Sequence, residues 1–226
     1  MMKNIIIVAA HPDDEVLGCG GAISKLIKQG AKAHVLFIAD GISSRGVEKT
    51  DSALLQLRYE AGKKAAEILG VISISFENYP DNKLDTVPML DIVKSIENKI
   101  EEIQPDTVFT HHSGDVNIDH RRISEAVIVA CRPQNQHPVK NILFFEVPSS
   151  TEWQPPGTDS FFNPNWFIDI SDELETKLTA LKCYEDELRT WPHPRSIKGV
   201  SHLAHWRGAT IGVDAAEAFF LARKIT

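Results

Sequence analysis

The sequence predicts an α/β protein with a mostly parallel sheet and helices on both faces of that sheet. Two observations support this fold class. Short apolar runs typical of strands alternate with helical segments, and polar clusters follow the ends of several predicted strands. Alternation of this kind implies right-handed crossover connections and parallel strands. The chain has 226 residues, enough for one sizeable core and short for two, so we expect a single domain over residues 1–226.

Five apolar runs predict the strands, and the segments between them predict the helices. The strands are expected at residues 5–10, 34–39, 72–76, 107–110 and 142–146. The helices are expected at residues 22–29, 54–69, 87–103, 120–131 and 171–184. The segment 87–103 has the clearest amphipathic pattern, with apolar residues three and four positions apart. Residues 41–50, 149–165 and 189–198 are predicted loops, and the tail from Ser201 is expected to be helical, with breaks near Gly208 and Gly212.

Composition argues against several classes of main partner, although a local basic patch is compatible with it. The formal net charge is −7, which argues against nucleic acid or anionic lipid as the main partner. No apolar run approaches the roughly 20 residues that span a bilayer, and the N-terminus fits a first strand better than a signal peptide. The three cysteines are scattered, which favours a reducing cytoplasm. We therefore expect a cytoplasmic protein with a small-molecule substrate and no membrane insertion.

The run His11-Pro12-Asp13-Asp14-Glu15 places an imidazole and three carboxylates directly after the first predicted strand. In parallel α/β sheets, ligands bind at the carboxyl ends of strands. Catalytic zinc takes three protein ligands and leaves a position for water. His11 and Asp14, three residues apart in a loop, can both face one ion. A structural alternative is a capped turn in which Asp13 and Asp14 accept backbone N–H groups before a helix.

A second polar cluster, Asn117-Ile118-Asp119-His120, follows another predicted strand and offers a third zinc ligand in His120. Asp119 could orient a ligand or a catalytic group from behind the metal site. Asp13 is then placed to take a proton from a water on the metal. The residues themselves thus predict a metal site with a base placed beside the metal-bound water.

Two motifs together resemble a known family. They are the run 10–15 followed by Gly18-Cys19-Gly20-Gly21, and the later pair Asp119-His120. This pattern resembles the PIG-L/LmbE-like zinc-dependent N-deacetylases, which include the N-acetylglucosaminyl-phosphatidylinositol de-N-acetylase and the deacetylases of mycothiol and bacillithiol synthesis. The resemblance covers nearly the whole chain in the order of strands and helices. It implies a Rossmann-like fold and hydrolysis of the amide of an N-acetylated amino sugar.

The resemblance also implies roles for individual residues. It implies zinc bound by His11, Asp14 and His120, with Asp13 as general base. Arg58 matches a helix arginine that binds sugar hydroxyls in the family; the alternative is a surface charge paired with a nearby Glu. Asp81 resembles the family's acidic sugar-binding position; the alternative is an ordinary turn residue.

The sequence departs from the family at Asn117. Many members have His-x-Asp-His there, and the first His is thought to stabilise the oxyanion or to protonate the leaving amine. An amide can donate a hydrogen bond to an oxyanion, but it cannot deliver a proton. Two histidines are candidates for that role. His112 follows a predicted strand, and His193 lies in a proline-restricted loop whose Arg195 could bind an anionic group of the substrate.

We therefore expect zinc-dependent removal of the acetyl group from an acetamido sugar or sugar conjugate. One alternative is another metal hydrolase such as a phosphoesterase, because strand-end Asp and His residues also suit two-metal sites. Another is a sugar-binding protein with a vestigial metal site, an idea motivated by Asn117. Members of this family are often oligomeric, so the resemblance also implies a homo-oligomer as one state of assembly.

Overall fold

The structure is a computed structural model that describes residues 2–42, 52–134, 138–155 and 161–226. Within them, seven strands form one sheet in the order β3-β2-β1-β4-β5-β7-β6. The strands are β1 (Asn4–Ala9), β2 (Lys32–Ala39), β3 (Ser73–Tyr79), β4 (Thr107–His111), β5 (Asn141–Phe145), β6 (Trp166–Asp169) and β7 (Ala216–Lys224). The first five pair in parallel, and β7 is antiparallel to both of its neighbours. The predicted fold class, a mostly parallel α/β sheet, is confirmed.

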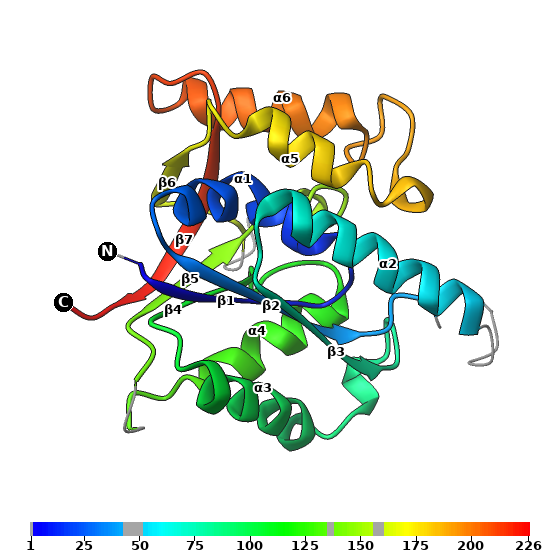
Figure 1. Ribbon diagram of the computed structural model, residues 1–226, viewed down its shortest axis with the longest axis vertical. Coiled ribbons are helices and arrows are strands. Elements are labelled where there is room, and N and C mark those ends of the chain that lie inside the picture. The colour runs from blue at the N-terminus through cyan, green and yellow to red at the C-terminus, as the bar shows by residue number, and fades with distance from the viewer. Residues whose placement is uncertain (1, 43–51, 135–137, 156–160) are drawn as a thin grey trace.

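Helices cover both faces of the sheet (Figure 1). One face carries α3 (Met89–Ile103) and α4 (Ile118–Ala130), and the other carries α1 (Asp14–Lys28), α2 (Ser52–Leu69) and α5 (Leu174–Leu181). A further helix, α6 (Ile197–Ala209), packs against both α5 and β7. The described residues also form three short 3-10 helices: η2 (Leu84–Thr86), η3 (Thr151–Trp153) and η4 (Glu185–Glu187).

The central strand β1 explains why the sheet is covered on both sides. Ile5 and Ile7 belong to the apolar cluster under α1 and α5, whereas Ile6 and Val8 belong to the cluster under α3 and α4. All four are fully buried. A strand buried on both faces is a continuous apolar run without polar alternation, as this segment is. The polar run His11–Glu15 therefore begins where β1 ends, at the carboxyl edge of the sheet.

The C-terminal tail differs from the prediction. The tail was expected to be helical from Ser201, but α6 ends at Ala209 and the chain returns as β7 between β5 and β6. The prediction was therefore wrong beyond Ala209. Gly212 has a positive φ of 80°, which glycine adopts without strain, and it lies in the turn between α6 and β7. The short strand β6 was not predicted, and most of the predicted loop 41–50 lies outside the described residues.

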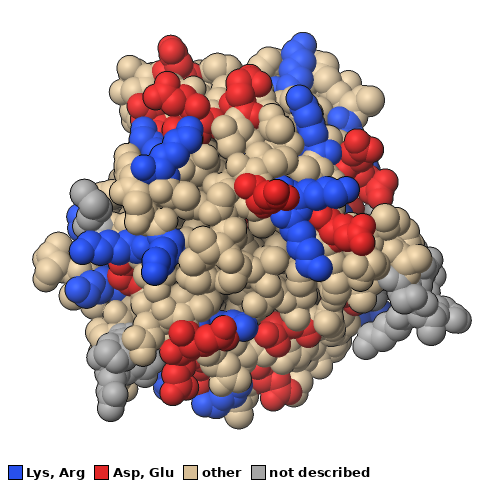
Figure 2. All heavy atoms as spheres, viewed as in Figure 1, with Lys and Arg blue, Asp and Glu red and all other residues tan. Residues whose placement is uncertain are grey.

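The composition of the helices and the charge of the surface bear on two kinds of partner, membranes and nucleic acid. In the described part of the chain, no helix combines the length and apolarity that crossing a bilayer requires. On the face shown in Figure 2, acidic and basic side chains are interspersed. That face therefore offers no broad basic surface of the kind that nucleic acid binds.

Candidate metal centre

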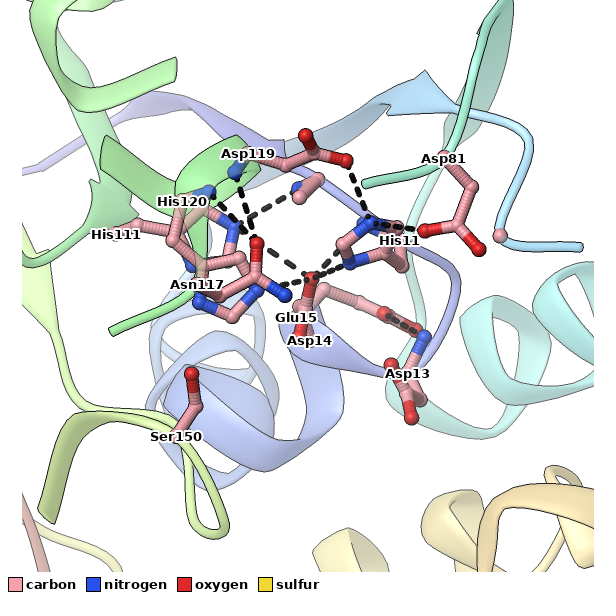
Figure 3. Close-up of polar contacts among 12 residues, drawn as sticks. His11, Asp13, Asp14, Glu15, Asp81, His111, Asn117, Asp119, His120 and Ser150 are labelled. Carbon is pink, nitrogen blue, oxygen red and sulfur yellow. Dashed lines mark hydrogen bonds and ion pairs between the residues drawn. The ribbon is translucent and has the colours of Figure 1, made fainter. Parts of the chain in front are cut away.

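Four polar segments meet at the carboxyl edge of the sheet (Figure 3). The run His11–Glu15 follows β1, Asp81 follows β3, and His111 ends β4. The first turn of α4 then contributes Asp119 and His120. The convergence expected from the parallel strand order is present, and it brings together side chains that lie more than a hundred positions apart in the sequence.

Asp14 lies at the centre of the cluster. Its Oδ2 atom is 3.2 Å from Nδ1 of His11 and 3.4 Å from Nε2 of His120. One ligand atom from each of these three residues can be chosen so that all lie within 4.8 Å of one another. All three side chains are buried. Two imidazole nitrogens and one carboxylate oxygen form a donor set that suits a catalytic zinc ion, so the residues fit the metal that the sequence predicts.

The backbone at Asp13 separates the two neighbouring carboxylates. Asp13 has a φ of 128°, an uncommon value for a residue with a side chain, and α1 begins at the next residue. Figure 3 shows Asp14 directed toward the two histidines and Asp13 directed away from them. Glu15 braces this bend: its Oε2 accepts the N–H of Asp13 at 3.1 Å, and its Oε1 accepts the hydroxyl of Tyr184 at 2.5 Å. Backbone strain of this kind often marks a functional site.

The far side of His11 faces two carboxylates. Its Nε2 lies 2.9 Å from Oδ1 of Asp81 and 3.1 Å from Oδ2 of Asp119. Asp119 is itself fixed by the backbone N–H groups of Asn82 and Leu84, at 2.7 and 3.0 Å. These contacts direct Nδ1 of His11 toward Asp14. Asp81 is therefore more than a turn residue, since it contacts a candidate metal ligand.

Behind His120 lies Asp115, a residue that the sequence analysis missed. Its Oδ2 is 3.1 Å from Nδ1 of His120. The hydroxyls of Ser150 and Thr151, at the start of η3, donate to the same carboxylate. On the other side, His111 stacks on His120 with 3.9 Å between ring centroids. The sequence did offer one signal for Asp115: it is an acidic residue in the loop between the predicted strand 107–110 and His120, at the same strand end as the other site residues.

Electrostatics in the cluster favour a cation. Burial would lower the pKa of both ligand histidines, but nearby carboxylates outweigh it: Asp14 and Asp115 raise the pKa of His120 to about 9, and Asp119 and Asp14 raise that of His11 well above 6.5. Burial would raise the pKa of Asp14, but His120 and His111 hold it well below its usual value. The carboxylates thus attract positive charge to the atoms that would bind a metal.

A second buried network begins at Asp13. Nη1 of Arg195 lies 3.3 Å from Oδ2 of Asp13 and 3.6 Å from Oε2 of Glu187. The other oxygen of Glu187 pairs with Arg58. Glu187 thus joins two arginines from distant segments, and sequence reasoning missed it. The alternative for Arg58, a surface charge paired with a nearby Glu, is confirmed in the pairing, with Glu187 of η4, and wrong in the exposure, because Arg58 is buried. Burial and the Asp14 charge together raise the pKa of Asp13 to about 7, against the opposing effect of Arg195.

Asn117 is engaged in local structure. It is the N-cap of α4: its Oδ1 accepts the N–H of Asp119 at 2.8 Å and that of His120 at 3.4 Å. Its Nδ2 donates to Oδ1 of Asn82 at 3.2 Å. Capping of this kind stabilises a helix by about 1 kcal/mol. Asn117 therefore holds in place the turn that carries two site residues.

The two histidines expected to deliver a proton lie in different surroundings. Nδ1 of His193 accepts the backbone N–H of Arg195 at 3.1 Å, and its ring meets Trp153 edge-on. His193 therefore lies on the Asp13 side of the site, next to the residue that contacts Asp13. His112 is buried, and its ring packs edge-on against Phe162 with 5.3 Å between ring centroids.

The fold and the site define an α/β protein with a candidate metal centre of two histidines and one aspartate at the carboxyl edge of its sheet. Residues 6–131 match the family model described as PIG-L: GlcNAc-PI de-N-acetylase. The match includes every candidate metal ligand and covers more than half of the chain. The chain belongs to the PIG-L/LmbE-like deacetylase family.

Similar proteins support the same family. An Escherichia coli (strain K12) protein named uncharacterized deacetylase YaiS is 31% identical, over 80% of this chain and 89% of its own. A diacetylchitobiose deacetylase of Thermococcus kodakarensis is 30% identical, over 82% and 70%. The solved N,N'-diacetylchitobiose deacetylase of Pyrococcus horikoshii has a TM-score of 0.79 at 23% identity, over 98% of this chain and 84% of that one. A 4-oxalmesaconate hydratase of Pseudomonas putida is 25% identical, over 84% and 76%.

Proposed function

We propose that this protein is a zinc-dependent N-deacetylase that removes the acetyl group from an acetamido sugar or sugar conjugate. The observation that carries the proposal is the buried set His11, Asp14 and His120 with Asp13 beside it, in a chain of the PIG-L family. The names of the diacetylchitobiose deacetylases support an acetylated sugar as the substrate class. We propose that residues 1–226 act as one domain. Three free cysteines support a location in the cytoplasm, and a homo-oligomer stays a prediction.

Zinc suits the donor set. When bound, a zinc ion supplies polarisation of the amide carbonyl and a lowered pKa for water. His11, Asp14 and His120 would hold it. Asp119 and Asp81 face the second nitrogen of His11, and Asp115 faces that of His120, so both rings are held in orientations that direct one nitrogen toward Asp14. Contacts of this kind behind metal ligands fix ring orientation and raise ligand basicity.

Asp13 is the proposed general base. Its Oδ2 takes a proton from the attacking water while Arg195, 3.3 Å away, holds the carboxylate in place. A pKa raised to about 7 suits a base that works near neutral pH. The departing nitrogen must gain a proton when the C–N bond breaks. His193, next to Arg195, is our first candidate for the donor and His112 the second.

The remaining predicted site residues have narrower proposed roles. The second N–H of the Asn117 amide is the donor left for an oxyanion, because its carbonyl caps α4 and its first N–H binds Asn82. Arg58, Asp81 and Arg195 remain proposed substrate-binding residues. Arg195 contacts Asp13 directly, Arg58 is connected to Arg195 through Glu187, and Asp81 contacts His11.

The experiment that tests this function is an acetate-release screen. The zinc-loaded protein is incubated with free, glycosidic and nucleotide-linked N-acetyl amino sugars, and acetate and free amine are quantified together. Equal amounts of both products on at least one substrate are expected, with His120→Ala as the inactive control that weakens zinc itself. No acetate from any acetamido sugar, in a protein that holds one zinc per chain, contradicts the proposal. Hydration of an unsaturated carboxylate by the same sample would then favour the chemistry named for the Pseudomonas putida relative.

A phosphoesterase is the second candidate, and one observation favours it. His11, Asp81 and Asp119 form a second group whose ligand atoms lie within 4.8 Å of one another. The two groups share His11, through Nδ1 in one and Nε2 in the other. A bridging imidazole is a poor match for phosphoryl chemistry, whose metal ions lie about 4 Å apart. Metal counting decides: two ions per chain support the phosphoesterase, and one supports the deacetylase.

A further inference from the structure

The helix that begins with Asp14 is broken in its second turn. Within α1, Cys19 has φ −150° and ψ 20°, which is not helical. The first turns, with Asp14 and Glu15, are therefore a separate piece from the longer part that ends at Lys28. The thiol of Cys19 is fully buried and donates to the carbonyl of Glu15 at 3.4 Å. A sharp break inside a helix has an identifiable cause, such as a group inserted into its hydrogen-bond ladder.

The inserted group is an ion pair between Lys177 of α5 and Glu217 of β7. In a continuous helix, the carbonyl of Leu17 would accept the N–H of Gly21. Here the carbonyl of Leu17 accepts from Nζ of Lys177 at 2.8 Å, and the N–H of Gly21 donates to Oε1 of Glu217 at 3.0 Å. Oε2 of Glu217 accepts the next N–H, that of Ala22, at 2.7 Å. Nζ of Lys177 and Oε1 of Glu217 are 2.5 Å apart, so the pair spans the break.

Burial makes this pair unusual. Lys177 is 3% exposed and Glu217 is 5% exposed. A buried ion pair gains little net stability over apolar residues of similar volume, because both charges must leave water. Its specific use here is to bond three backbone groups next to the break, the carbonyl of Leu17 and the N–H groups of Gly21 and Ala22. Both residues also lie beyond the segment 6–131 that matches the family model.

Three packed rings, those of Phe145, His111 and His120, connect the break in α1 to the metal centre. Gly18 lies so close to Phe145, at the end of β5, that an added Cβ would be 2.3 Å from a ring carbon. The ring of Phe145 packs edge-on against His111, with 4.7 Å between centroids. His111 stacks on His120 at 3.9 Å. The position of Gly18 thus limits where Phe145 and His111 can pack against His120, and the same piece of helix carries Asp14.

We propose that Lys177 and Glu217 are positioning residues for the metal centre. They hold α1 open at Cys19, and this sets the place of Asp14 directly and that of His120 through Phe145 and His111. Neither residue touches the metal ligands themselves. The proposal rests on the proposed metal site, but its readout is metal binding, which is measured without any substrate.

The test replaces the pair by apolar residues in Lys177→Met/Glu217→Leu, which leaves no unpaired buried charge. Co²⁺ is the probe, because its visible absorption reports ligand geometry. With the ion pair gone, Leu17 and Gly21 can bond to each other and close the break. We expect Co²⁺ affinity to fall about 10-fold, as for loss of a group that orients metal ligands, with a shifted absorption band. The midpoint of urea unfolding of the metal-free protein should stay close to that of the wild type.

Two further variants keep the result decisive. Glu217→Gln preserves the shape and one acceptor oxygen, so its Co²⁺ affinity should lie between those of the wild type and the double variant. Lys28→Met/Glu173→Gln removes another ion pair between α1 and the start of α5, away from the break, and should leave affinity and spectrum unchanged.

Wild-type Co²⁺ affinity and spectrum in a folded double variant would overturn the proposal. If the double variant does not fold, Glu217→Gln decides by the same criterion, and failure of both to fold assigns the pair to folding alone. A wild-type protein that binds no Co²⁺ contradicts the proposed function itself, which separates the two failures.

Discussion

The carboxylate of Asp115 lies 3.1 Å from Nδ1 of His120, on the opposite side of the ring from Asp14. A carboxylate behind a ligand histidine fixes the ring and strengthens it as a donor. We predict that Asp115→Asn weakens zinc about 10- to 100-fold, the usual cost of losing such a partner. Competition with a chromophoric chelator measures the affinity. Ser150→Ala, which removes one hydroxyl donor to Asp115, should have a smaller effect, and an unchanged affinity in Asp115→Asn contradicts this role.

Zinc binding should release protons at neutral pH. The pKa of His120 is raised to about 9, so its ring carries a second proton at pH 7 before metal binds, and the carboxylates Asp119 and Asp14 raise the pKa of His11 in the same direction. Zinc needs the free nitrogen, so binding releases about one or two protons, and affinity increases as pH increases toward 9. Calorimetry in buffers of different ionisation enthalpy counts these protons. Binding without proton release contradicts the raised pKa values.

Glu187 should be important for stability. It is 4% exposed and neutralises two arginines, Arg58 and Arg195. Glu187→Gln leaves their charges without this buried partner, and we expect a loss of about 3 kcal/mol in the free energy of unfolding. Urea denaturation measures it. Glu185→Gln, two residues away and exposed, is the matched control and should change stability by less than about 0.5 kcal/mol. Equal stability of the two variants contradicts the network.

The parallel strands and the helices that cover them follow from clear sequence patterns. The strand around Ile6 is a continuous apolar run, and apolar residues recur every three to four positions in 87–103. β7 was not predicted because its first four residues are all buried and include Glu217, a charge whose partners, Lys177 and two backbone N–H groups of α1, come from distant parts of the sequence. β6 has four residues and pairs only with β7, so nothing local indicates it.

The candidate site was predictable where ligands come in short motifs and unpredictable where partners meet through tertiary contacts. His11, Asp14 and His120 lie in two polar runs after strands. Asp115 contacts His120 in an orientation held by hydroxyls 35 and 36 positions away, and Glu187 joins two arginines that are distant in the sequence. Asn117 was interpreted only as a replacement for the histidine of the family motif. An Asn directly before the first residue of a helix is also a typical N-cap, and Asn117 has that role in α4.

The most direct test of the central claim is the zinc content and turnover of Asp13→Asn, on the substrate that gives most acetate. Asp13 is the only acidic residue of the run 13–15 that is left for proton transfer, because Asp14 faces the metal site and Glu15 braces the bend. We predict one zinc per chain and a loss of about 10²- to 10⁴-fold in kcat, the usual contribution of a general base. Near-normal turnover in a folded, zinc-loaded Asp13→Asn protein would contradict the account.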